Sequence, residues 1–284
     1  MMLKIAVQKS GRLYDHSLQL LKECGIEVSN GTRQLKVVAF NFPVEVYFLR
    51  DDDIPQYVYD GVADVGFVGE NVVYEKNKDI SVVNKLGFGR CRLSIAVPKN
   101  MQYKSVADLQ NLKIATSYTT LLQSFLDAKK INAEIHEISG SVEIAPGIGL
   151  ADAICDLVSS GSTLLTNGLK EAEVVLDSEA VLIANKNLTA ENKKILDKLI
   201  MRINAVKTAK NNKYILLNAP NAQLKNIASV LPGMKSPTIV PLAEEGWSSV
   251  HSVVNESDFW EIIEKLKSFG AQGILVVPIE KMIL

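Results

Sequence analysis

The sequence predicts an α/β protein with two lobes, followed by a smaller ferredoxin-like domain. Two observations carry this prediction. Short apolar segments alternate with helical segments through most of the chain, and residues 213–278 run strand, helix, strand twice over. A length of 284 residues and a hydrophobic content of 47% allow more than one core.

The first lobe is expected over residues 1–90, joined by a returning segment at about 180–208. Its apolar runs are short, as in strands, and the segments between them have helical spacing. The expected strands are residues 3–7, 44–49 and 63–69, and the expected helices are residues 14–25 and 52–61. This alternation favours a mostly parallel sheet covered by helices.

The second lobe is expected over residues 91–179, where the same alternation starts again. Strands are expected at residues 91–98, 112–118 and 133–138, with a helix at 120–130. Residues 172–185 read as one strand that returns the chain toward the first lobe. Two such lobes leave a cleft, and the carboxyl ends of parallel strands are where these folds bind ligands.

The third region, residues 209–284, follows a helix expected at 195–210 and changes in character. Strands are expected at residues 213–219, 236–242, 247–254 and 272–278, with helices at 221–231 and 257–270. The two halves have the same order and similar length, which is typical of a ferredoxin-like βαββαβ arrangement.

Composition excludes some partners. Thirty-one basic and 32 acidic residues leave a net charge of −1, so no global field recruits nucleic acid or an anionic membrane. The three cysteines are widely spaced, which argues against a disulfide framework or a zinc site. The amino-terminal apolar run is too short for a signal peptide, and no segment approaches about 20 apolar residues, so we expect a cytoplasmic protein.

The most informative segment is "DAICDLVSSGSTLLTNGL", residues 152–169. A buried strand is expected to end near Ser159, followed by small hydroxyl and glycine residues that open a helix, a setting that favours a phosphate. Asp152 and Asp156 would repel phosphate unless they address sugar hydroxyls or a cation, so a phosphorylated ribose would suit both features. The alternative is a Ser/Gly-rich turn with acids at solvated strand ends.

Cations and glycines also mark other strand ends. "QKSGRL" places Lys9 and Arg12 beside Gly11, where the first strand meets the first helix, which indicates a polyphosphate site or a solvated turn. "RDDDIP" offers Asp52 or Asp53 as a helix cap. "GFVGENV" places Glu70 and Asn71 at a helix entry, and "GFGRCRLS" places Arg90 and Arg92 on one side of a strand between the lobes.

Taken together, "QKSGRL", "RDDDIP", "GENV", "GRCRLS", "ATSY" and the segment from 140 to 169 resemble the ATP phosphoribosyltransferase family, in order and spacing, from residue 3 to the chain end. The segments "LPGMKSPTIVPL" and "FGAQGILVVPIEKM" resemble the long form of that family, which carries its own regulatory domain. "SSGSTL" has Ser160 where the family often has threonine. The resemblance implies a periplasmic-binding-protein-like catalytic region and an ACT-like regulatory domain.

The resemblance implies that N1 of the ATP adenine attacks C1 of phosphoribosyl pyrophosphate and releases pyrophosphate, the first step of histidine biosynthesis. Asp152, Asp156, Arg92 and Lys9 are then expected in catalysis. The phosphoribosyl pyrophosphate site is expected to comprise Glu143, Asp152, Ala153, Asp156, Ser159, Ser160, Gly161, Ser162, Thr163 and Leu164. The ATP site is expected to comprise Lys9, Gly11, Arg12, Arg50, Asp51, Glu70, Asn71, Arg92 and Ser117. Mg²⁺ is expected on the pyrophosphate, with Glu143 as a ligand.

The resemblance also implies feedback inhibition by L-histidine and assembly from dimer to hexamer. We place the histidine site near Ser236, Pro237 and Thr238, at a surface between subunits. One alternative is a two-lobed receptor or sensor without catalysis, although the sequence has no evident secretion signal or DNA-binding helix pair. A second alternative is a different phosphoribosyltransferase, which would use another base.

Overall fold

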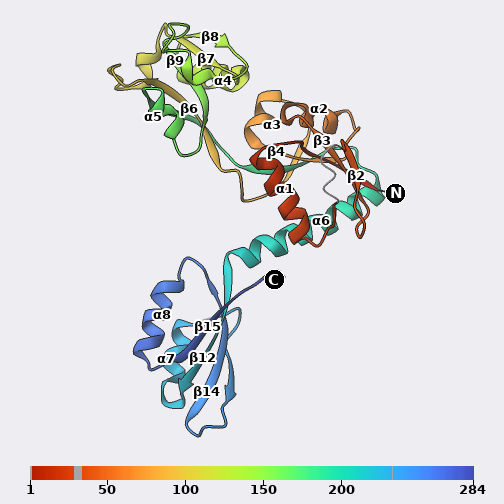
Figure 1. The fold of residues 1–284 in the computed structure, drawn as a ribbon, viewed down its shortest axis with the longest axis vertical. Coiled ribbons are helices and arrows are strands. Elements are labelled where there is room, and N and C mark those ends of the chain that lie inside the picture. Colours follow the sequence, from red (N-terminus) through yellow and green to blue (C-terminus); the bar gives the residue numbers. More distant parts are fainter. Residues whose placement is uncertain (1, 29–33, 232) are drawn as a thin grey trace. The chain divides into compact units, whose positions relative to one another are not determined.

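The computed structural model describes residues 2–28, 34–231 and 233–284. The chain divides into two compact units, Met1–Asp197 and Lys198–Leu284. Figure 1 labels the helices and strands of both units in chain order. The first unit contains two sheets, which define lobe I and lobe II, and the second contains one sheet.

Lobe I is built on a six-stranded sheet of order β2-β3-β1-β4-β11-β5. Strand β1 pairs in parallel with β3 and β4, whereas β2 and β11 pair antiparallel to their neighbours, so the sheet is mixed and not mostly parallel. The strands are β1 (Leu3–Gln8), β2 (Lys36–Val38), β3 (Val44–Leu49), β4 (Val65–Gly69), β5 (Ser81–Lys85) and β11 (Ala180–Ala184).

The helices of lobe I follow the strands as expected from the alternation. They are α1 (Arg12–Glu23), the 3₁₀ turn Asp51–Asp53, α2 (Ile54–Tyr59) and α3 (Glu70–Lys76). Pro55 stands at the start of α2, where its missing N–H costs nothing, and Ile54 and Val58 are fully buried against the sheet. Helix α2 therefore fixes the chain directly after β3, where Asp51 lies.

Lobe II is built on a five-stranded sheet of order β10-β6-β9-β7-β8. Strand β7 pairs in parallel with β8 and β9, and β6 runs antiparallel between β9 and β10. The strands are β6 (Cys91–Pro98), β7 (Lys113–Thr116), β8 (Glu134–Glu137), β9 (Ala153–Val158) and β10 (Leu169–Ser178). The helical segments are Val106–Leu109, α4 (Thr119–Lys129), Val142–Ile144 and α5 (Ser162–Thr166).

The chain passes between the lobes twice. It leaves lobe I after β5 and returns after β10, where Glu179 separates two strands that belong to different sheets. The expectation of one strand over residues 172–185 is therefore wrong: the polar residues Asp177, Ser178 and Glu179 mark the crossing, and the chain changes sheets there. Strand β11 is fully apolar and lies between β4 and β5, so the returning segment completes the core of lobe I.

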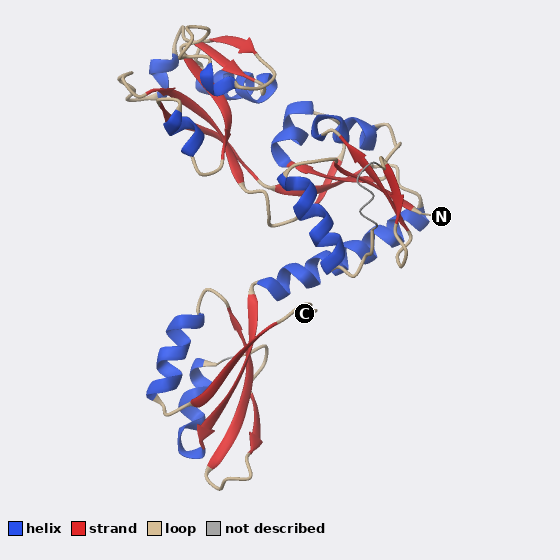
Figure 2. Ribbon diagram, in the orientation of Figure 1, coloured by secondary structure: helices blue, strands red, loops and turns tan. Residues whose placement is uncertain are grey.

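The second unit has the expected ferredoxin-like order. Its strands β12 (Asn212–Pro220), β13 (Thr238–Pro241), β14 (Trp247–Asn255) and β15 (Gln272–Pro278) form a sheet of order β13-β14-β12-β15. Helices α7 (Leu224–Val230) and α8 (Phe259–Ser268) lie on the same side of this sheet (Figure 2). The core between them includes Ile227 and Leu266.

Helix α6 (Ala190–Lys210) leads into the second unit and is longer than expected. The polar run before residue 195 is helical too, because Ala190 and Glu191 are good helix formers and Thr189 accepts a hydrogen bond from the Asn192 N–H at the start. None of the helices in the described ranges is long and apolar enough to span a membrane.

Candidate active site

The carboxyl edge of lobe I gathers the charged residues that follow its parallel strands. Lys9 follows β1 and Arg50 follows β3, and the two strands end in register, with Gln8 opposite Leu49. The Lys9 N–H donates to the Leu49 carbonyl at 2.8 Å. Both side chains are exposed, so this edge presents two cations to solvent.

A cavity of about 270 Å³ lies at the carboxyl end of β9 in lobe II. It is lined by residues from both lobes, since Arg12 at the start of α1 reaches it from lobe I. The lining from lobe II consists of Glu143, Asp156, Leu157, Val158, Ser159, Ser160, Gly161, Ser162, Thr163 and Leu164. One cation, a chain of hydroxyls and two carboxylates thus share one cavity.

The loop from Ser159 to Gly161 is shaped for close backbone approach. Gly161 has φ +80° and ψ 0°, a left-handed conformation that disfavours side chains, and it precedes the first residue of α5. The Ser160 and Ser162 hydroxyl oxygens lie 3.0 Å apart, which places two rotatable donors beside each other. Hydroxyls and backbone N–H groups at such a turn favour an anion.

The acidic pair of the cavity consists of Asp156 and Glu143. Burial raises the pKa of Asp156 above its ordinary value, the Leu157 N–H at 2.7 Å opposes this shift, and the charge of Glu143 adds to it. Two carboxylates that line one cavity favour a cationic partner. The cavity therefore offers an anion-binding end at the loop and a cation-binding side at Asp156.

Arg92, on β6, is held in an ion pair. Its guanidinium donates to both carboxylate oxygens of Glu171, and Ser94 Oγ donates to the same carboxylate at 2.7 Å. A further hydrogen bond runs from Arg92 Nη1 to the Ser159 carbonyl at 3.4 Å. The ion pair lowers the pKa of Glu171 and raises that of Arg92. Arg92 thus contacts the residue at which the loop begins, Ser159, and is not among the residues that line the cavity.

Asp51 is mostly buried at the end of β3. Burial, with a smaller contribution from Asp52, raises the pKa of Asp51 to about 6. Its Oδ1 atom is buried and has no hydrogen-bond partner among the residues that the structure describes. An unpaired buried carboxyl oxygen is costly, so this position is suited to accept a ligand donor.

Three other residues expected at the ATP site already have partners in the protein. The Glu70 carboxylate lies 3.2 Å from Lys85 Nζ and accepts from the Tyr74 hydroxyl at 3.3 Å. Asn71, only 4% exposed, bonds Ser178 Oγ at 3.0 Å. Ser117 Oγ donates to the Ile138 carbonyl at 2.6 Å. Gly11 has φ +90° and precedes α1, so it lets Arg12 begin that helix.

Asp152 and Ala153 lie at the opposite end of β9 from the loop. Asp152 Oδ2 accepts from the Lys113 N–H at 2.8 Å, and Ala153 is fully buried. Four residues of strand correspond to about 13 Å, so Asp152 and Asp156 do not meet at one ribose. The structure thus brings Asp156, and not Asp152 or Ala153, to the cavity.

Two residues at the contact between α3 and α4 were not selected from the sequence. The Tyr118 hydroxyl accepts from Asn71 Nδ2 at 3.3 Å, and burial, with the charge of Asp156, raises the pKa of Tyr118. Glu75, on α3, bonds the start of α4 in lobe II. The "ATSY" segment was a signal for Tyr118, whereas nothing local marks Glu75.

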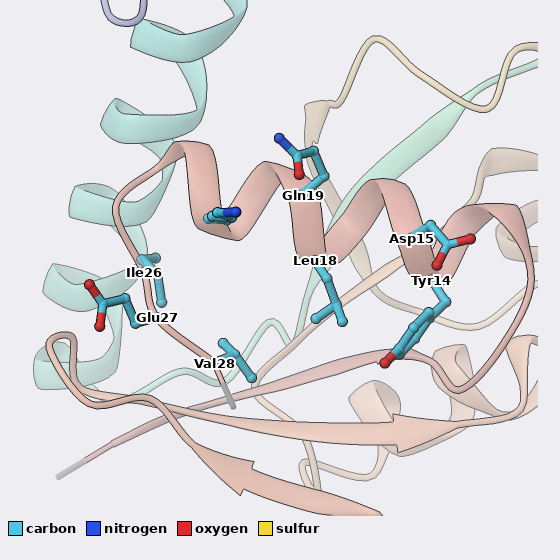
Figure 3. A pocket seen from close by; sticks show the side chains of 8 residues that line it. Tyr14, Asp15, Leu18, Gln19, Ile26, Glu27 and Val28 are labelled. Atoms are coloured by element: carbon cyan, nitrogen blue, oxygen red, sulfur yellow. The ribbon is translucent and has the colours of Figure 1, made fainter. Parts of the chain in front are cut away.

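A larger cavity of about 540 Å³ lies along α1, and its lining residues are not those of the cavity at β9. It is lined by side chains of α1, among them Tyr14 and Leu18, and by the segment from Ile26 to Val28 (Figure 3). Within the described ranges, its charged lining is two acids, Asp15 and Glu27, against one cation, Lys22, and its lining residues include no serine-rich turn that a phosphorylated ligand would use. The smaller cavity at β9 is therefore the better site for such a ligand.

In the second unit, Ser236, Pro237 and Thr238 lie at and before the start of the edge strand β13. Ser236 and Thr238 are exposed, and Thr238 stands opposite His251 on β14. His251 in turn lies 2.7 Å from the Tyr214 hydroxyl through Nδ1 and 3.0 Å from Ser249 Oγ through Nε2.

The fold and the site together define a two-lobed α/β protein of the periplasmic-binding-protein-like class, with a serine-rich loop and an acidic pair in one cavity. Comparison of the sequence with known families makes the assignment specific. The chain belongs to the ATP phosphoribosyltransferase family. The sequence model of this family matches residues 50–205, and the model of its C-terminal domain matches residues 209–281. The second match indicates the long form. The enzymes of this family are pentosyltransferases that act on ATP and phosphoribosyl pyrophosphate in the first step of histidine biosynthesis.

Relatives and solved structures agree with this assignment. ATP phosphoribosyltransferase of Cytophaga hutchinsonii is 62% identical over 99% of this chain and 98% of its own length. That of Bacteroides thetaiotaomicron is 59% identical over the full length of both. The ATP phosphoribosyl transferase (HisG:HisZ) complex from Thermotoga maritima is similar with a TM-score of 0.61 and 27% identity, covering 72% of this chain and 99% of that one. These matches do not favour a receptor without catalysis.

A likeness of fold alone extends further. The structure of Tv2483 bound to L-arginine matches 74% of this chain and 88% of its own with a TM-score of 0.50 and 15% identity. Such a match supports the two-lobed architecture alone. It says nothing of function, because proteins with unrelated functions share this fold.

Proposed function

We propose that the cavity at β9 binds the phosphorylated ribose of phosphoribosyl pyrophosphate. The observation that carries this proposal is the lining itself, where Arg12 and the loop from Ser159 to Leu164 face Asp156 across one cavity of about 270 Å³. The loop would take the 5-phosphate through backbone N–H groups and hydroxyls. Arg12 would neutralise phosphate charge from the other lobe.

The transfer forms a bond between adenine N1 and ribose C1 while the bond from C1 to pyrophosphate breaks, and the pyrophosphate keeps the bonding electron pair. Adenine N1 attacks with its own lone pair, so no strong base is needed. The ribosyl group gains positive charge in the transition state, and Asp156 would stabilise that charge and bind ribose hydroxyls. Asp152 would keep a structural role at the start of β9.

For ATP, we assign the carboxyl edge of lobe I. Lys9, Gly11 and Arg50 would receive the triphosphate, and the buried Oδ1 of Asp51 would accept a donor from the adenosine. Asn71 and Ser117 would complete this side. Glu70 and Arg92 would act through the ion pairs that already hold them, Glu70 with Lys85 and Arg92 with Glu171.

The family requires a divalent metal, and we propose Mg²⁺. No group of three or more acidic, histidine or cysteine side chains in the described parts of the chain could hold a metal alone. Glu143 and Asp156 nevertheless line one cavity with hard oxygen ligands, and Mg²⁺ is commonly bound by one or two carboxylates together with substrate phosphates. These two residues therefore fit the ion, which would neutralise the pyrophosphate when bound.

We also propose that the second unit is regulatory, that L-histidine inhibits the enzyme, and that the chain assembles as a dimer or hexamer in the cytoplasm. The histidine site would lie near Ser236, Pro237 and Thr238, because β13 is an edge strand that a second copy could extend.

The test is an ultraviolet difference spectrum of the full chain with ATP, phosphoribosyl pyrophosphate and Mg²⁺, coupled to pyrophosphatase. The proposal expects a new chromophore that requires both substrates and is suppressed by L-histidine. Replacing Mg²⁺ with a chelator should abolish it. Activity that L-histidine does not inhibit would contradict the regulatory proposal alone. Binding of the substrates without product formation would favour the alternative of a receptor without catalysis.

A further inference from the structure

Helix α4 begins at the carboxyl edge of lobe II without a cap from its own neighbours. Tyr118 occupies the N-cap position, its side chain makes no capping hydrogen bond, and the first turn carries no acidic residue. The first backbone N–H groups of a helix have no partner inside it and favour a negatively charged acceptor.

Glu75 supplies that acceptor from the other lobe. This residue lies on α3, and its Oε1 accepts from the Thr120 N–H and its Oε2 from the Leu121 N–H, both at 3.0 Å. The Thr119 hydroxyl is a weaker third donor at 3.4 Å. A single carboxylate thus bonds two successive N–H groups of a helix that belongs to a different sheet.

The same face of α3 makes a second contact with the start of α4. Asn71 lies four residues before Glu75, on the same side of the helix, and its Nδ2 donates to the Tyr118 hydroxyl at 3.3 Å. Asn71 is also fixed by Ser178 at the crossing between the lobes. Helix α3 therefore holds α4 at two points.

The start of α4 is connected in turn to the strand that carries the cavity. The Tyr118 N–H donates to Thr116 Oγ1 at 2.9 Å, and Thr116 Oγ1 donates to the Cys155 carbonyl at 2.7 Å. Cys155 directly precedes Asp156 on β9. The cavity needs both lobes, because Arg12 comes from lobe I and the rest of the lining from lobe II.

We propose that Glu75 is a positioning residue: by capping α4 from lobe I, its carboxylate fixes the arrangement of the lobes that brings Arg12 to the loop of Ser159 to Leu164. Glu75 touches no reacting atom in this role. The inference rests on the proposed function, since it takes phosphoribosyl pyrophosphate as the ligand of the cavity.

The test is a double-mutant cycle on the full chain, with the Kd for phosphoribosyl pyrophosphate measured by calorimetry in Mg²⁺. Arg12→Ala should raise Kd by about tenfold, as expected for the loss of a charged hydrogen-bond donor, and Glu75→Ala by a comparable factor. The double variant should bind only as weakly as the weaker-binding single variant, because Glu75→Ala alone already moves Arg12 away from the cavity. If the increase in Kd of the double variant were the product of the two single increases, the inference would be overturned. No effect of Arg12→Ala on Kd would instead refute the proposed phosphate site.

Two further variants separate positioning from helix stability. Glu75→Ala combined with Thr120→Asp gives α4 an acid in its own first turn. The melting temperature of the protein should then recover, while Kd stays at the value of the Glu75→Ala variant. Recovery of Kd would reduce Glu75 to a stabilising cap. Gln123→Ala, which removes an exposed side-chain contact to Asp127 on the same helix, is the matched control and should leave Kd unchanged.

Discussion

The Arg92 guanidinium contacts both carboxylate oxygens of Glu171 and also donates to the Ser159 carbonyl. The two residues lie on neighbouring antiparallel strands, β6 and β10, so the ion pair joins these two strands beside the loop that begins at Ser159. Its position links the sheet to the residue at which the loop begins.

Removing the Glu171 carboxylate should therefore weaken substrate binding, although Glu171 itself would not contact the substrate. We expect Glu171→Ala to raise the KM for phosphoribosyl pyrophosphate by a factor of about three to ten while kcat changes little, because Arg92 then loses the partner that orients it. Steady-state kinetics checks this. Glu134→Gln, which removes the exposed ion pair with Lys113 in the same sheet, is the control and should have no effect.

The two aspartates of β9 should separate sharply. Asp156→Asn should lower kcat by about a hundredfold or more, because it removes a charge beside the developing ribosyl cation. Asp152→Asn should keep near-normal kcat, because its remaining oxygen still accepts from the Lys113 N–H. Circular dichroism would establish that both variants fold. Equal losses in the two variants would contradict the placement of the ribose at Asp156.

The raised pKa of Asp156 also predicts a pH dependence. The ionised form is the active one, so kcat/KM should fall on the acid side at a higher pH than an ordinary aspartate would give. Because the charge of Glu143 contributes to the shift, Glu143→Gln should move this limb to lower pH. A pH–rate profile of both proteins measures the displacement, and an unmoved limb would exclude Asp156 as the titrating group.

Asp51 predicts a pH-dependent stability. Its pKa rises from an ordinary value of 3.8 to about 6 on folding, so between these values the folded chain binds more protons than the unfolded one. The stability that this group contributes is present below the unfolded pKa and is lost as pH rises through the folded pKa. Asp51→Asn should therefore gain stability over the wild type between about pH 4 and pH 7, by up to about 3 kcal/mol. Chemical denaturation at several pH values measures it, with the exposed Asp53→Asn as control.

Gly161 predicts a loop effect that can be separated from backbone strain. An alanine at φ +80° costs about 1 kcal/mol or more, although nothing lies closer than 3.9 Å to its new Cβ. Gly168→Ala carries the same kind of strain at φ +71° with open space around it. Both variants should lose similar stability, but only Gly161→Ala should raise the KM for phosphoribosyl pyrophosphate. A matching rise in Gly168→Ala would attribute the effect to general destabilisation.

Periodicity was sufficient to predict most helices and strands: burial alternates along β3, the buried positions of α1 recur at helical spacing, and β9 begins with a buried apolar run. It failed at residues 172–185, where two strands of different sheets follow each other with only Glu179 between them, so that they read as one extended segment. Strand β5 also escaped prediction, since none of its residues is fully buried and its pairing partner, β11, lies nearly a hundred positions further along the chain.

For the site, residues near one another in sequence were the predictable ones. The loop after β9 gathers in the cavity because a turn keeps Ser159 to Leu164 together. The pairing of Arg92 with Glu171, and of Glu75 with α4, joins residues far apart in sequence, so only the tertiary structure reveals them. Asp152 was expected beside Asp156 because the two are close along the chain, yet the extended strand β9 separates them by about 13 Å.

The insertion of β11 between β4 and β5 has a consequence for biosynthesis. A ribosome releases β4 and β5 well before residues 180–184 exist, so the nascent amino-terminal half carries an open strand edge and β5 has no neighbour to join. Lobe II is contiguous, from β6 to β10, and can close first as the chain emerges. Lobe I is therefore the first to be translated and the last of the two to be completed, and its exposed edge during that interval is where a nascent-chain chaperone would act.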